Sequence, residues 1–388
     1  MERRKRIFTT IALLAPFLSL YSTEILTFTY FDISLLLMVI IVIFTAHIFH
    51  VSKELIIYAS MIVILYIIDM LVMDLDFKDV TLRMLRYVFY ITYLALFSID
   101  YFDIFYGEKL YRYISVISSV FILIQLLVYK ILGHYIPGFL TFLPLIREEL
   151  LWHYMNYENR FIYDPRPRSF FSEPQIFATF VLGYLAILLF KDKWTKKDKM
   201  VIVILCVGII VSMSTTAIIG LAFIWLIFLI KIIIRKKVSV FVAFLLVVAA
   251  LLMFIIPVMY SERLHLGSHS VTGRLGIYSV FWGSKSDFLN LMIGHGMVDI
   301  DTSSLPGYLG FIPSLFRIYY YYGVIGCAVL TMIFIRLYRK INLKYKYLLL
   351  LVVMLMIGTV DFFGIMIFVS IPFIISSSSH NLMEEGTL

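Results

Sequence analysis

The chain has 388 residues, of which 62% are hydrophobic and 15% are charged, with a mean hydropathy of +0.97 and a net charge of +8. Soluble domains contain roughly 45–50% apolar and 25% charged residues, so this composition excludes a soluble globular protein. The positive charge does not indicate a nucleic-acid partner, because its distribution along the chain follows the topology of a membrane protein.

Apolar runs predict about twelve transmembrane helices. A helix needs about 20 apolar residues to cross a hydrocarbon core roughly 30 Å thick, and continuous runs such as 33–44 lack the alternation of a membrane β-barrel. The predicted segments, in chain order, are 7–21, 32–47, 55–73, 84–99, 113–132, 172–190, 200–213, 215–234, 238–258, 315–335, 347–358 and 362–376. The sequence therefore predicts an all-α polytopic membrane protein with a single integral membrane domain over 1–388.

The charges of the connecting segments predict the orientation. With the amino terminus inside, most of the 33 Lys and Arg fall in the inner segments, so both termini are predicted to be cytoplasmic. The first apolar run has no small-residue cleavage site after it, and we expect it to be retained. Two outer connections are long, at 134–171 and 259–314. Long loops between membrane helices commonly carry function, so these two are the predicted location of the site.

The first outer loop runs directly into a helix. Ser172 with Gln175 three residues later predicts a capping box, and Pro174 suits the first helical turn. Arg166 and Arg168 lie just upstream. A helix start close to arginines suits an anionic group such as a pyrophosphate.

Each of these residues also has a simpler interpretation. The arginines could anchor the loop to lipid headgroups or pair with acidic residues of the loop. Glu173 is either a carboxylate at the helix start or a catalytic base.

The second outer loop contains a second candidate group. The spacing of its apolar residues predicts a short amphipathic helix that is capped by Thr272, with Arg274 in its first turn and Trp282 at its end. His295, between two glycines, could be a general acid or base, a donor to phosphate, or a structural turn residue. The histidines of this loop lack the spacing of metal ligands, so neither a metal nor a cofactor is predicted.

The order of these motifs resembles a known family. An Arg and a Glu-Pro pair open a helix, Ser-Thr-Thr lies between two helices, and Gly-Arg, Trp and Gly-x-Gly follow in a long outer loop. The matching positions are Arg168, Glu173, Pro174, Ser214 to Thr216, Arg274, Trp282, Gly294 and Gly296. This pattern resembles the Wzy-type repeat-unit polymerases of O-antigen and capsular polysaccharide, together with the related O-antigen ligases.

The sequence departs from this family in two ways. Ser169 stands where relatives often have a glycine, and no His-Asn pair precedes the tenth helix as it does in many ligases. The second departure argues against a ligase.

The resemblance implies a membrane glycosyltransferase of GT-C-like architecture in the bacterial cytoplasmic membrane. Such an enzyme joins polyprenyl-pyrophosphate-linked oligosaccharides on the outer face of the membrane. The reaction inverts the configuration at the first carbon of the donor sugar and needs no metal. The implied partners are these substrates, membrane lipid, and a chain-length regulator and flippase of the same pathway. In this reading Arg274 is a catalytic residue that stabilises the pyrophosphate, together with Arg168 and, from their positions in the sequence, Arg166 and Arg317. The catalytic base is either Glu173 or His295, and Trp282 either stacks on a sugar or anchors the loop at the membrane interface.

The main alternative is a transporter, for example a flippase for the same lipid-linked sugars. A transporter should carry ionisable groups near the bilayer midplane, often beside broken helices. The sequence offers few of these. Asp69 is expected near the outer end of its helix, where its side chain could reach the membrane surface, and Asp361 is expected in a turn.

Overall fold

The computed structural model describes residues 2–23, 28–44, 50–72, 77–133, 136–140, 142–145, 167–236, 288–297, 313–358 and 366–384. Within these ranges the regular elements are helices, accompanied by isolated β-bridges. The chain forms two compact units, and each unit is built from two separate stretches. Unit 1 comprises Met1–His47 and Asp103–Ile255, and unit 2 comprises Ile48–Phe102 and Ile256–Leu388.

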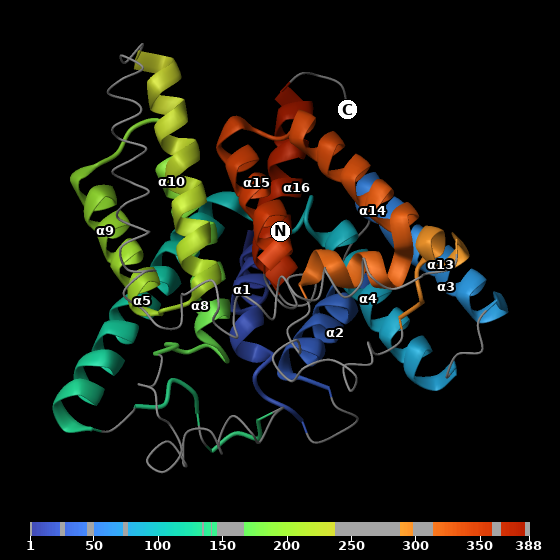
Figure 1. The fold of residues 1–388 in the computed structure, drawn as a ribbon, viewed down its shortest axis with the longest axis horizontal. Coiled ribbons are helices and arrows are strands. Elements are labelled where there is room, and N and C mark those ends of the chain that lie inside the picture. Colours follow the sequence, from blue (N-terminus) through green and yellow to red (C-terminus); the bar gives the residue numbers. More distant parts are fainter. Residues whose placement is uncertain are drawn as a thin grey trace. The chain divides into compact units, whose positions relative to one another are not determined.

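Unit 1 is organised around one buried helix. Its described helices are α1 (Glu2–Leu18), α2 (Tyr30–Ile43), α5 (Ile104–Leu132), α8 (Pro174–Leu189), α9 (Lys196–Val211) and α10 (Thr215–Lys236). Every side chain of α8 from Phe177 to Leu189 is buried. Helices α5, α9 and α10 pack against it, and Figure 1 shows α9 and α10 beside α8. Because α8 is apolar on all sides, it fits only where neighbouring helices surround it.

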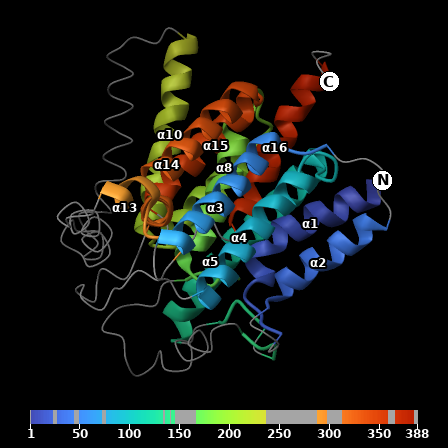
Figure 2. The ribbon, with the colours of Figure 1, turned by 90° about the vertical axis from the view of Figure 1, so that its right-hand side faces the viewer.

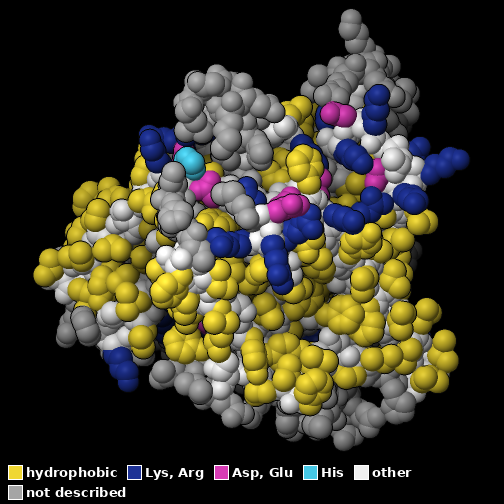
Figure 3. Space-filling model, turned by 180° about the vertical axis from the view of Figure 1, so that it is seen from behind, with side chains coloured by type: hydrophobic (Ala, Val, Ile, Leu, Met, Phe, Trp, Pro, Cys, Tyr) yellow, Lys and Arg dark blue, Asp and Glu magenta, His cyan; other side chains and the backbone are white. Residues whose placement is uncertain are grey.

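Helix α5 buries several small polar side chains and exposes several large apolar ones. Ser118 and Ser119 are buried, whereas Ile117 is 57% exposed and Leu127 is 58% exposed. The small serines let α9 approach closely, since a Cβ added to Gly208 would lie 2.8 Å from the Cβ of Ser119. This arrangement is the reverse of a soluble amphipathic helix and suits contact with lipid. Hydrophobic side chains also cover much of the described surface in Figure 3.

Unit 2 is organised around a broken helix. Its described helices are α3 (Lys53–Val72), α4 (Phe77–Phe97), α13 (Phe288–Ile293), α14 (Ser314–Lys340), α15 (Leu343–Gly358) and α16 (Ile367–Glu384). Helices α3 and α4 pack together as a pair, as Figure 2 shows, and α14 packs on α3, α13, α15 and α16. The path of α14 breaks at Gly323, where φ is 57° and ψ is −158°.

The helices support the predicted class of protein. Among the described residues, five helical segments are long and apolar enough to cross a membrane. They are Lys53–Leu71, Val80–Phe97, Ile104–Leu132, Thr216–Ile233 and Ser314–Lys340. The prediction of a helical membrane protein is confirmed at this level. The number of twelve crossings and the orientation of the termini stay predictions.

Eleven of the twelve predicted segments coincide with described helices, and the segment 238–258 lies outside the described residues. The largest difference is at α5, which begins well before residue 113. Its N-cap is Asp103, whose side chain accepts a hydrogen bond of 3.0 Å from the Tyr106 N–H. The first turns of α5 carry charged residues, so a search for apolar runs misses them.

Candidate functional site

The first candidate site lies in unit 2, where a tight turn packs against the break in α14. A Cβ added to Gly323 would lie 2.4 Å from the carbonyl oxygen of Met292 and 2.7 Å from the N of Gly294. Gly294 has a φ of +91°, and a Cβ there would lie 2.5 Å from the carbonyl carbon of Tyr321. Only glycine at both positions permits this close approach of two backbones.

His295 is fixed in this turn. Its N–H donates to the carbonyl oxygen of Tyr320 at 2.7 Å, and its ring stacks on the Tyr320 ring with centroids 4.7 Å apart. Burial lowers the pKa of His295 below its ordinary value. Burial therefore favours the neutral form of the imidazole, in which one ring nitrogen has a lone pair.

Arg317 lines a small cavity beside the break. The cavity has a volume of about 10 Å³, and its lining comes from α3, α4 and the first half of α14: Tyr58, Tyr87, Ser314, Arg317, Ile318, Tyr321 and Tyr322. The lining therefore combines one guanidinium group with the side chains of four tyrosines.

Tyr322 and Asp69, both in unit 2, each have a buried polar oxygen atom. The Tyr322 hydroxyl and Asp69 Oδ1 make no hydrogen bond among the described residues, although Tyr322 is 3% exposed and Asp69 is 2% exposed. The expectation that Asp69 reaches the membrane surface is wrong. Helix α3 packs against α4 and α14, and Asp69 lies on a covered face of α3, whereas the neighbouring Ile67 and Leu71 are exposed.

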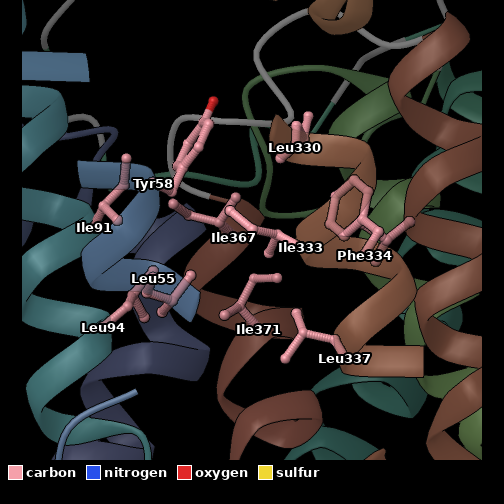
Figure 4. Close-up of a pocket in the computed structure, with 11 residues that line it drawn as sticks. Leu55, Tyr58, Ile91, Leu94, Leu330, Ile333, Phe334, Leu337, Ile367 and Ile371 are labelled. Atoms are coloured by element: carbon pink, nitrogen blue, oxygen red, sulfur yellow. The ribbon is translucent and has the colours of Figure 1, made fainter. Parts of the chain in front are cut away.

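A second cavity in unit 2 is apolar. It has a volume of about 30 Å³, and Figure 4 shows the aliphatic side chains that surround it. Tyr58 lines both cavities, and in Figure 4 its hydroxyl points away from the aliphatic side chains. The ring of Tyr58 thus separates an apolar space from the cavity that Arg317 lines.

The second candidate site lies in unit 1, in the loop before α8. Ser169 has a φ of 55°, which favours glycine, and Gln125 of α5 holds it there. The Ser169 N–H donates to Gln125 Oε1 at 2.8 Å, while Gln125 Nε2 donates to the carbonyl oxygens of Ile136 at 2.8 Å and Ser169 at 3.4 Å. Gly138 leaves room for this loop, since a Cβ there would lie 1.7 Å from the Ser169 carbonyl oxygen.

This loop fixes Arg168 near the start of α8. Arg168 Nη1 donates to the Ser172 carbonyl oxygen at 2.6 Å, and the guanidinium carbon lies 5.6 Å from the centre of the Phe139 ring. Pro174 occupies the first helical turn, as predicted. The predicted capping box is wrong, because the N-cap is Glu173, one residue later than Ser172, and its side chain makes no capping hydrogen bond.

No family model matches the sequence, and no curated protein matches it. The functional argument therefore depends on the residues of the chain itself.

The structure places the predicted site residues in two groups. His295 and Arg317 belong to unit 2, and Arg168 and Glu173 belong to unit 1. Three further predicted residues lie outside the described residues: Arg166, Arg274 and Trp282.

Sequence reasoning missed Tyr322 and the role of Gln125. It placed Asp69 correctly near the end of its helix, but did not predict that the side chain is buried. The available signals were an isolated Asp and an isolated Gln in apolar helices, and four consecutive tyrosines directly before Gly323.

Proposed function

We propose that this protein is a polysaccharide polymerase, a membrane glycosyltransferase that joins polyprenyl-pyrophosphate-linked oligosaccharide repeat units at the outer face of the bacterial cytoplasmic membrane. The observation that carries the proposal is the position of Arg317, in the first turn of α14 and close along the chain to Tyr320, whose carbonyl oxygen accepts the hydrogen bond from the His295 N–H. The resemblance to repeat-unit polymerases, which includes the two glycines beside His295, supports the same function.

Arginines bind the pyrophosphate in this mechanism. A guanidinium presents paired N–H donors to phosphate oxygens and stays charged at any physiological pH, so Arg317 stabilises the charge of the leaving pyrophosphate. Arg168, near the start of α8 in unit 1, is proposed separately as a cation for a phosphate group. Arg166 and Arg274 are proposed for the same kind of contact, and Trp282 for stacking on a sugar.

The bond-forming step needs a base. A hydroxyl oxygen of the acceptor sugar attacks the first carbon of the donor saccharide, and the bond from that carbon to the pyrophosphate oxygen breaks. The electron pair leaves with the pyrophosphate, and the hydroxyl proton passes to the base. His295 is one candidate, because its lowered pKa favours the neutral form. Glu173 is the other, with its side chain not engaged in capping α8.

The test uses purified protein and lipid-linked saccharides extracted from cells that lack the gene. A ladder of longer lipid-linked products is expected with the natural chain. Arg317→Ala should lower the rate at least a hundredfold, and Arg317→Lys should recover little, because a lysine lacks the paired donors. Arg6→Ala is the control, since Arg6 is an exposed partner of Glu2 and should have no effect on the rate. The absence of any elongation by the natural chain contradicts the proposal.

A transporter is the second candidate, and one observation favours it. Asp69 is a buried carboxylate in a membrane-length helix, and it belongs to the same unit as the broken helix α14. Both features are common in transporters. Translocation of the extracted lipid-linked saccharides across reconstituted vesicles, without elongation, would favour this candidate over the polymerase.

A further inference from the structure

Unit 1 has a strongly basic surface around the start of α9. The segment 191–199, which leads from α8 into α9, contains five lysines and two aspartates. Neighbouring helices add two cations. Arg112 Nη1 of α5 donates to Asp198 Oδ1 at 2.9 Å, and Lys231 Nζ of α10 lies 5.1 Å from the centre of the Phe190 ring. The segment 191–199 with Arg112 and Lys231 is called the basic surface below.

The segment 191–199 has a fixed conformation. Thr195 and Asp198 form a capping box at the start of α9, and Asp198 Oδ2 also accepts a hydrogen bond from Lys191 Nζ at 3.1 Å. The Trp194 ring stacks on the Phe228 ring of α10, with the ring centroids 5.2 Å apart. The lysines of this segment therefore extend from an ordered backbone, in contrast to the cations of a disordered tail.

Four lysines of this segment are exposed, and their side chains make no hydrogen bond or ion pair with any described residue: Lys193, Lys196, Lys197 and Lys199. The buried Asp198 carboxylate does not compensate them, because it already binds two other cations. Like charges this close repel one another, and three of the four lie in the first turn of α9, where the helix dipole is also positive. An anion from outside the protein would remove both penalties.

Apolar side chains begin directly beyond the basic surface. On α9, Lys199 is followed by Met200 and Val203, which are both 61% exposed. On α5, one to two turns beyond Arg112, Ile117 is 57% exposed. Exposed apolar side chains on membrane helices face lipid chains, and the cations at the end of such a helix lie at the level of the lipid headgroups. The surrounding groups at that level are phosphates.

From this arrangement we infer that the basic surface of unit 1 binds anionic phospholipids. The ammonium groups of the four exposed lysines contact phosphate oxygens, and the lipid chains lie along the exposed apolar side chains of α5 and α9. A zwitterionic headgroup carries its own cation and leaves the excess positive charge uncompensated, whereas an anionic headgroup neutralises it. The inference goes beyond the proposed function and does not depend on it.

The experiment measures thermal unfolding of the purified full chain in micelles of dodecyl maltoside, which is a neutral detergent. A ligand that binds the folded state raises the unfolding midpoint in proportion to its affinity and concentration. Phosphatidylglycerol, which is anionic, should raise the midpoint, and zwitterionic phosphatidylcholine should raise it much less. Inorganic phosphate should have little effect, because it has no chains to pack on the apolar side chains. Equal stabilisation by the two lipids, or by inorganic phosphate, overturns the inference.

Two quadruple variants at the same exposed positions separate the charge from other effects. One variant replaces Lys193, Lys196, Lys197 and Lys199 by Gln, and the matched control replaces the same four residues by Arg. The Gln variant should bind phosphatidylglycerol at least about tenfold more weakly than the natural chain, and the Arg control should bind it as tightly. Phosphatidylglycerol binding that is unchanged in the Gln variant overturns the inference.

A folding defect in the Gln variant is excluded by the same measurement. Without anionic lipid, the Gln variant should unfold at the same temperature as the natural chain or higher, because the repulsion between the lysines is gone.

An acidic protein segment is the alternative partner for such a surface, and polyglutamate is its probe. Polyglutamate should stabilise the natural chain less than phosphatidylglycerol at the same concentration of negative charge. An equal or larger stabilisation by polyglutamate, lost in the Gln variant, would overturn the assignment to lipid.

Discussion

Each of the two units buries an aspartate, but the two carboxylates differ in their hydrogen bonding. In unit 1, Asp198 Oδ1 accepts a hydrogen bond from Arg112 Nη1 at 2.9 Å, and Oδ2 accepts from Lys191 Nζ at 3.1 Å and from the Thr195 N–H at 3.0 Å. In unit 2, Asp69 Oδ1 has no hydrogen-bond partner among the described residues. A buried carboxylate with several partners stabilises a fold, whereas one without them lowers stability and indicates a functional role.

The largest expected effect tests the break in α14 at Gly323. Gly323→Ala should destabilise the protein by more than about 3 kcal/mol, because the backbone angles suit only glycine and the new Cβ would meet Met292 and Gly294. The measurement is denaturant unfolding in detergent micelles. Gly133→Ala is the matched control. Gly133 also has a positive φ, of 70°, but no atom within 4 Å of an added Cβ, so we expect about 1 kcal/mol. An equal loss of unfolding free energy in both variants would show that the close backbone contacts at Gly323 do not contribute to stability.

The next effect compares the two aspartates directly. Asp198→Ala should cost about 2–3 kcal/mol, because it removes a hydrogen-bonded carboxylate and leaves Arg112 and Lys191 without it. Asp69→Leu should instead raise stability by about 1 kcal/mol, because it replaces an incompletely paired buried carboxylate with an apolar side chain. Unfolding of both variants under the same conditions gives the comparison. A loss of stability in Asp69→Leu as large as that in Asp198→Ala would contradict it.

A third prediction concerns pH. Burial raises the pKa of Asp198, but hydrogen bonds from Thr195 and Lys191 outweigh burial and lower the pKa from 3.8 to about 2. A depressed pKa contributes stability that is present above pH 3.8 and is lost as the pH falls from there towards 2. The natural chain should lose about 2 kcal/mol over this interval through Asp198, and Asp198→Asn should lack that part of the decline. Parallel pH profiles for the two proteins would contradict the prediction.

The smallest effect concerns packing. Val352→Ile adds one methylene group next to the apolar cavity of unit 2 and should stabilise the protein by about 0.5–1 kcal/mol. Val181→Ile makes the same change in the fully buried helix α8 of unit 1, where it should cost about 1 kcal/mol through overpacking. Thermal unfolding in detergent measures both. A loss of stability in Val352→Ile would mean that the cavity does not accept the methylene group.

Much of the helical framework is predictable from the sequence, because apolar runs are long and the bilayer demands a minimum length. The helix starts are less predictable. Asp103 caps α5 ahead of several charged residues, and Glu173 instead of Ser172 is the N-cap of α8. In both cases the helix boundary depends on the local backbone conformation, which a hydrophobicity scale does not describe.

The candidate site was predictable only in part. His295 between two glycines and Arg317 were recognisable as residue types with a chemical use. The cavity was not, because it depends on the break at Gly323 and on the packing of α3 and α4 against α14. The burial of Asp69 is likewise a consequence of tertiary packing, which the position of a residue along one helix does not reveal.

The interleaving of the two units has a consequence for biosynthesis. Helices α3 and α4 belong to unit 2, but the rest of that unit comes from the stretch that begins at Ile256. At roughly 5–20 residues per second, the ribosome makes α14 on the order of 10–40 s after α4 is complete. During that interval the α3–α4 hairpin must enter the membrane with Asp69 not yet covered by α14. A chaperone or the insertion machinery that shields this hairpin would therefore act on the part of the chain that carries the buried carboxylate.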